Sequence, residues 1–101
     1  MAIGMKNLII SSEIKEKLAL KHNLSREDVE QCFKNRTHSY LRDTRLEHLT
    51  EPITEWFISE NDSGKLIKIV CIFNNGQIFL KSAFPPNEKE ISIYNSISIP
   101  C

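Results

Sequence analysis

The chain has little glycine, no excess of charge and no long hydrophobic run. Its three glycines are far apart, which excludes the closely spaced glycines of a phosphate-binding or dinucleotide-binding loop. Its 13 basic and 13 acidic residues give a formal net charge of zero, so no overall basic field draws the chain to nucleic acid. No apolar stretch is long enough to span a bilayer, and the first residues lack the pattern of a secretory signal. We therefore predict a cytoplasmic protein that makes no membrane contact.

Cysteine and histidine are also few. The three cysteines form no C-x-x-C pair, and an odd number cannot complete a set of disulfides, which favours reduced thiols. No two histidines stand at the i, i+4 spacing of a helical zinc site, and no cysteine lies at ligand spacing. The sequence predicts neither a metal site nor a cofactor.

The length predicts one domain over residues 1–101, with a core at about 12–95. A helix is expected from Ser12 to His22, because apolar residues recur there at a spacing of four, with Ser11 or Ser12 as its N-cap and Asn23 at its end. A second helix is expected after Ser25, where Asp28 approximates a capping box, and it continues to about Asn35. The link between the two is very short, so we predict a helical hairpin.

The second half of the chain predicts strands. Alternating sequence indicates strands at about 53–59, 66–73 and 77–83, and an extended segment at 37–44. The strand at 66–73 is apolar on nearly both faces and should be central. Asn75-Gly76 predicts a hairpin, because both residues tolerate the positive φ of a type I′ turn. After Pro85-Pro86, Asn87 caps a helix at about 88–95, and the tail at 96–101 is open between an edge strand and a frayed end.

These elements predict an α+β fold. The helices pack on one face of a three- to four-stranded antiparallel sheet: two N-terminal helices come before the strands, and a short C-terminal helix follows them.

Short motifs at the end of the first helix and after the last strand add a resemblance. Lys21-His22-Asn23 precedes a capped helix, and Ser82-Ala83-Phe84 closes the last strand. The polar helix that follows carries Glu88, Glu90 and Tyr94. This arrangement resembles the BrnT family of toxins, which has a K-H-G start and an S-A-R motif in these places. The resemblance implies a RelE-like fold and metal-independent cleavage of RNA.

Phe84 departs from that pattern, which places an arginine there. The planar fork of arginine would hold an RNA phosphate through two hydrogen bonds, and phenylalanine cannot. Asn23 in place of glycine is a smaller change, since asparagine also accepts the left-handed conformation at a helix end. The chemistry would then fall to His22 and to the stretch from Arg42 to His48.

RNA cleavage needs a base, an acid and cations that hold the phosphate, and histidine, lysine and arginine supply all three. We predict four catalytic residues: His22, Arg45, His48 and Lys81. For His22 the alternative role is a favourable interaction with the dipole at a helix end. For Lys81, and for Lys68 in the central strand, phosphate binding stands against a structural role such as protection of a sheet edge.

The stretch from Arg42 to His48 is the densest group of charges. If it is extended, Asp43, Arg45 and Glu47 share a face; the alternative is a solvated loop whose ion pairs are each worth about 0–1 kcal/mol. Four residues are predicted to bind substrate: Lys21, Arg42, Glu47 and Tyr94. For the tyrosine, the alternative is a core anchor.

Two functions follow from the resemblance. The first is a BrnT/RelE-like domain that acts on RNA as a ribonuclease, or a descendant of one. The second is a non-catalytic binding or regulatory module of the same fold. Partners would be RNA or a small antitoxin protein, and a homodimer is left open. Some similar short chains carry the name ADP-ribosyl-(dinitrogen reductase) hydrolase, but that class is larger, all-helical and binds two magnesium ions through clustered aspartates, which this chain lacks.

Overall fold

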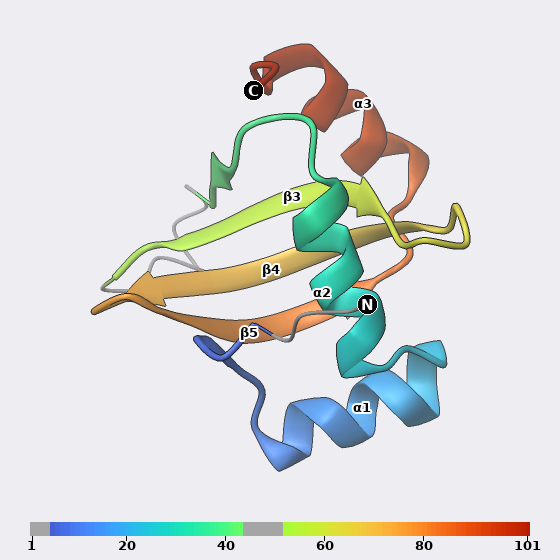
Figure 1. Cartoon of the computed structure of the whole chain (residues 1–101). Helices are drawn as coiled ribbons and strands as arrows, with labels where there is room; N and C mark the ends of the chain where they lie inside the picture. The colour runs from blue at the N-terminus through green and yellow to red at the C-terminus, as the bar shows by residue number, and fades with distance from the viewer. Residues whose placement is uncertain (1–4, 44–51) are drawn as a thin grey trace.

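The computed structural model describes residues 5–43 and 52–101. Figure 1 shows α2 crossing in front of the strands, with α1 below it and α3 above the sheet. The α+β class predicted from the sequence is confirmed. The described elements, in chain order, are β1 (Leu8–Ile9), α1 (Ser12–His22), α2 (Arg26–Asn35), β2 (Leu41–Arg42), β3 (Thr54–Glu60), β4 (Leu66–Asn74), β5 (Gln77–Phe84) and α3 (Glu88–Ile97).

The strands form one sheet in the order β1-β5-β4-β3-β2, so β4 holds the central place that its apolar sequence predicts. Strands β2 to β5 pair antiparallel, whereas β1 pairs with β5 in parallel. The sheet is therefore five-stranded and mixed, and the expected three to four antiparallel strands were too few. Strand β1 was missed because two residues show no period, although Leu8 is buried in the core.

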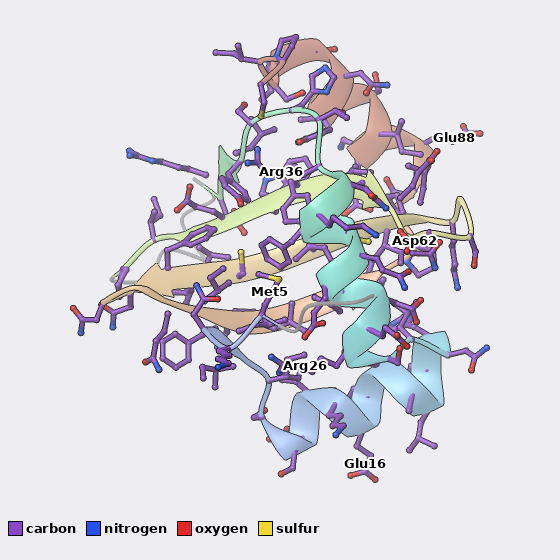
Figure 2. All side chains as sticks on the ribbon, viewed as in Figure 1. Met5, Glu16, Arg26, Arg36, Asp62 and Glu88 are labelled. Carbon is purple, nitrogen blue, oxygen red and sulfur yellow. The ribbon has the colours of Figure 1, made fainter. Side chains whose placement is uncertain are left out.

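Helix α2 holds the segment that carries β1. The Arg26 guanidinium donates to the Met5 carbonyl oxygen at 2.6 Å and to Glu30 Oε2 at 2.8 Å (Figure 2). The Met5 N–H donates to the same carboxylate at 3.3 Å. The N–H of Ile78 in β5 donates to the Asn7 carbonyl oxygen at 2.8 Å. These bonds place β1 against β5 without any help from local sequence propensity.

The helix ends follow the predicted caps. Ser11 caps α1 by accepting from the N–H of Ile14, and Asn23 ends it with φ 52°, in the left-handed region. Ser25 and Asp28 form the predicted capping box at the start of α2. Asparagine accepts positive φ more readily than most residues, so Asn23 can end the helix in this conformation.

The β4–β5 hairpin turns at Asn75-Gly76, as predicted. Their φ angles are 53° and 77°, the positive values that a type I′ turn requires at both positions. Further along, Val70 pairs with Ser82 but Cys71 pairs with Leu80, so the ladder contains a bulge. Lys81 is the extra residue of this bulge, and its side chain is exposed.

The two faces of the sheet are covered by different helices. Phe57 of β3 is fully buried, and its ring packs edge-on against Phe33 of α2 at 4.9 Å between centroids. Its neighbour Trp56 points to the other face, where its ring lies 5.6 Å from that of Tyr94 in α3. Helices thus lie on both faces, whereas the sequence placed them on one.

Helix α3 is fastened at its C-terminal end. The Tyr94 hydroxyl donates to the Ser39 carbonyl oxygen at 2.8 Å, and the Ser39 N–H donates to the Ile99 carbonyl oxygen at 2.8 Å. His38 and Pro100 form an isolated antiparallel bridge. The tail is therefore extended beyond Ile97, which is the edge-strand alternative of the sequence analysis.

Candidate functional site

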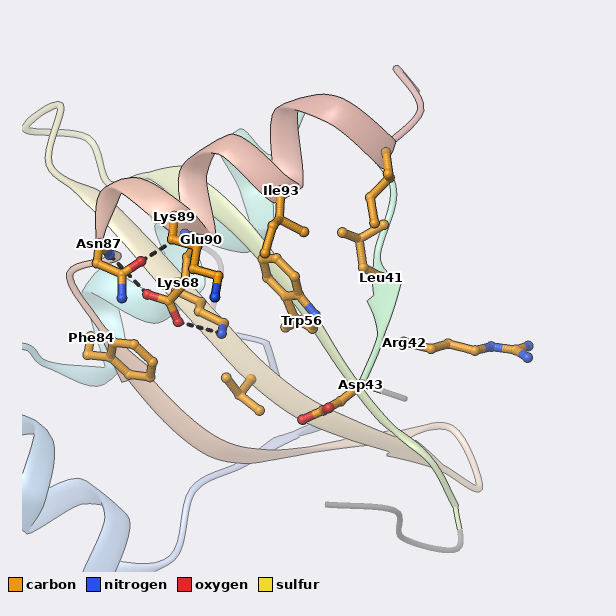
Figure 3. Close-up of a pocket in the computed structure, with 12 residues that line it drawn as sticks. Leu41, Arg42, Asp43, Trp56, Lys68, Phe84, Asn87, Lys89, Glu90 and Ile93 are labelled. Atoms are coloured by element: carbon orange, nitrogen blue, oxygen red, sulfur yellow. Dashed lines mark hydrogen bonds and ion pairs between the residues drawn. The ribbon is translucent and has the colours of Figure 1, made fainter. Parts of the chain in front are cut away.

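A groove of about 640 Å³ lies on the second face of the sheet, beside α3 (Figure 3). It forms because α3 covers only part of this face and leaves a mixed apolar and charged surface open. Strands β3 to β5 form its floor, α3 forms one wall, and β2 closes one end. The lining residues on which its chemistry depends are Trp56, Lys68, Phe84, Asn87 and Glu90, with Arg42, Asp43 and Lys89 at the rim.

Lys68 lies at the centre of the groove, between two aromatic rings and a carboxylate. Its Nζ is 2.7 Å from Glu90 Oε2, 4.4 Å from the ring centroid of Trp56 and 5.6 Å from that of Phe84. The lysine side chain is 12% exposed and the glutamate side chain 21%. Because β4 is the central strand, protection of a sheet edge does not explain this lysine.

Glu90 is held in place by its position in the first turn of α3. The Asn87 N–H donates to Glu90 Oε1 at 2.9 Å, and the Glu90 N–H donates to Asn87 Oδ1 at 2.8 Å. This is a capping box, in which one carboxylate oxygen serves the helix end. The other oxygen is the one that accepts from Lys68.

Phe84 stands directly opposite Lys68 in the β4–β5 ladder. The pairing brings the lysine ammonium close to the residue that closes the Ser82-Ala83-Phe84 segment. Phe84 also contacts His22 at the end of α1, with ring centroids 6.1 Å apart. The end of α1 and the end of the groove therefore meet at this one aromatic residue.

The structure brings only some of the predicted site residues together. His22 lies beside Phe84, with Lys21 exposed next to it at the end of α1. Arg42 lies at the groove rim, and Figure 3 shows its side chain extending away from Lys68. Lys81 is at the bulge and is not a lining residue of the groove. The remaining predictions, Arg45, Glu47 and His48, lie outside the described residues.

Tyr94 occupies the core. It is 4% exposed, and burial raises the pKa of its phenol to about 12, against the lowering effect of the Arg36 guanidinium and of a backbone hydrogen bond from Ile58. Its hydroxyl is already bonded to Ser39. In this position it anchors α3, which is the alternative role considered for it.

The buried thiols are not nucleophiles of this site. Burial is the largest cause that raises the pKa of both Cys32 and Cys71 to about 12. Both side chains are fully buried in the core, Cys32 on α2 and Cys71 on β4, as the sequence predicts for small apolar residues.

A scan against models of protein families and a search of curated proteins found no match for this chain. Within residues 5–43 and 52–101, no three histidine, cysteine or acidic side chains lie close enough to hold a metal ion. In the same described part, no helix is both long and apolar enough to cross a membrane.

Proposed function

We propose that this chain is a BrnT/RelE-like domain, descended from ribonucleases, that binds single-stranded RNA in the groove beside α3. The observation that carries the proposal is the position of the Lys68 ammonium between the rings of Trp56 and Phe84. Proteins bind single-stranded RNA by stacking unpaired bases on aromatic rings and by holding the phosphates with cations. The groove offers both within one small area.

The groove carries a local excess of positive charge, although the net charge of the whole chain is zero. Its lining includes three cationic side chains, Arg42, Lys68 and Lys89, and two acidic ones, Asp43 and Glu90. This gives an excess of one positive charge, the kind of local patch that a neutral chain needs to contact nucleic acid. The volume of about 640 Å³ is in the range of small-ligand sites, which suits an unpaired nucleotide.

Lys68 also supports the relation to the BrnT pattern. Phe84 cannot hold a phosphate, but its cross-strand partner is a lysine. The fold therefore keeps a cation at this place on the sheet, carried by the neighbouring strand. Lysine binds phosphate as a point charge rather than through a planar fork, so we expect weaker and less oriented binding than an arginine would give.

The chain holds a single tryptophan, so its fluorescence reports directly on the groove. A short single-stranded RNA is expected to quench Trp56 in a saturable way, because a base stacks on the indole ring. For one or two phosphate contacts, the logarithm of the binding constant should fall with the logarithm of salt concentration with a slope of about −0.7 to −1.4. A duplex of the same sequence is the control and should not quench. Absence of saturable quenching by any single-stranded RNA would overturn the proposal and favour a protein-binding module.

RNA cleavage is a second candidate function, favoured by the contact between His22 and Phe84. An imidazole at the groove end could take or give the proton that cleavage moves. A denaturing gel of the RNA recovered from the same titration separates cleavage from binding. Cleavage that persists in His22→Ala would remove this residue from the reaction.

A further inference from the structure

We infer that Glu90 is a built-in competitor for phosphate: its carboxylate occupies the Lys68 ammonium until a nucleotide displaces it. The inference rests on the proposed function, since it concerns the same groove. It adds a ligand preference: the groove accepts a phosphate that is attached to a base and rejects free phosphate.

The two aromatic rings leave one side of the Lys68 ammonium open to an anion, and the Glu90 carboxylate occupies that side. The ammonium has the Trp56 ring at 4.4 Å and the Phe84 ring at 5.6 Å, and the carboxylate at 2.7 Å supplies the charged hydrogen-bond acceptor. With the lysine side chain only 12% exposed, a phosphate cannot reach it while the carboxylate stays in place. Two anions at such short range would also repel each other strongly in a partly buried site.

The negative charge of Glu90 is not needed for the helix cap. The capping box uses Glu90 Oε1 to accept from the Asn87 N–H, and a neutral glutamine amide oxygen can do the same. The charge reaches Lys68 through the other oxygen, Oε2. The structural role of this side chain and its effect on the groove can therefore be separated by one isosteric substitution.

The aromatic rings decide which ligand can displace the carboxylate. Free phosphate would have to replace a charge-assisted hydrogen bond with another of similar kind, and it gains nothing further. A nucleotide adds the stacking of its base on Trp56 or Phe84, which compensates for the broken ion pair. The groove therefore selects nucleotides over inorganic anions.

The test is a titration with inorganic phosphate, followed by NMR at the resonance of the Trp56 indole N–H, which lies beside Lys68 and is present in every variant. Wild-type protein should show no saturable shift, whereas Glu90→Gln should bind phosphate at least about 5-fold more tightly, the lower end of usual couplings between two binding events. Glu88→Gln is the matched control: it removes the same charge from an exposed position in the same helical turn and should behave like wild type. Adding Lys68→Met to Glu90→Gln should abolish the gain.

The inference is overturned if Glu90→Gln binds phosphate no better than Glu88→Gln, or if Lys68→Met leaves the gain intact. Should Glu90→Gln fail to fold, Glu90→Ser carries the same test, because the Asn87 side chain still caps the N–H of residue 90. No RNA enters this titration. Its failure is therefore distinct from failure of the proposed function, which is decided by the quenching of Trp56 with RNA.

Discussion

Replacing Phe57 by alanine is expected to lower the free energy of unfolding by about 3–5 kcal/mol. The ring is fully buried and touches Phe33 of α2 and Tyr40, at 4.9 and 5.4 Å between centroids. It therefore joins the sheet to the helix that covers it, and the space left by its loss cannot be filled without moving that helix. Chemical denaturation followed by circular dichroism measures the change.

Leu20→Ala is the control for this measurement. Leu20 is 78% exposed on α1, so its loss should change the free energy of unfolding by less than about 0.5 kcal/mol. A Phe57→Ala variant as stable as this control would mean that α2 does not pack on β3 as described.

Replacing Trp56 by leucine is expected to weaken binding of single-stranded RNA by about 1–3 kcal/mol, roughly 5- to 150-fold in Kd. Trp56 immediately precedes Phe57 in β3. Its side chain points to the opposite face of the sheet, into the groove, where it lies beside Lys68 and Tyr94. Leucine keeps apolar contact with the lysine stem and with α3, and it removes the surface on which a base can stack. Fluorescence anisotropy of a labelled RNA is the measurement, since the intrinsic probe is lost in this variant.

Phe33→Leu is the matched control for binding. It also replaces an aromatic ring by leucine, but on α2 and on the opposite face of the sheet. It should bind RNA as wild type does once both proteins are shown to be folded. An equal loss of affinity in the two variants would point to a general effect on stability and would remove Trp56 from the RNA contact.

Local signals in the sequence were sufficient for the helices and the hairpin. Ser25 with Asp28 marks the start of α2, and Asn75-Gly76 marks the turn between β4 and β5. These signals are short-range, because each depends on backbone conformation and side-chain bonds within a few residues. The bounds of α1 were predicted from the same kind of signal and agree with the structure.

Features that depend on distant contacts could not be predicted in this way. Strand β1 forms because Arg26 and β5 hold residues 5–9 in place. It could not be predicted, because two residues are too few to show the alternation that marks a strand. The bulge at Lys81 shifts the alternation of β5, so the face on which that side chain lies cannot be counted from the turn. The side of the sheet taken by α3 is set by the core position of Tyr94 and its bond to Ser39.

The groove itself was only partly visible in the sequence. Lys68 stands out as a charged residue in an apolar strand, and Phe84 as a departure from a motif. That the two are cross-strand partners follows only from the register of the hairpin after the bulge. Glu90 was noted as part of the polar helix, but its pairing with Lys68 requires the position of α3.

The central proposal is that RNA binds the face of the sheet beside α3. Mapping of backbone amide and indole chemical shifts during titration with a short single-stranded RNA tests it most directly. We expect the largest saturable shifts at Trp56, Val70, Phe84 and Asn87, which line the groove, and no shifts along the buried side of α2. Shifts centred on α2, or none that saturate, would contradict the claim.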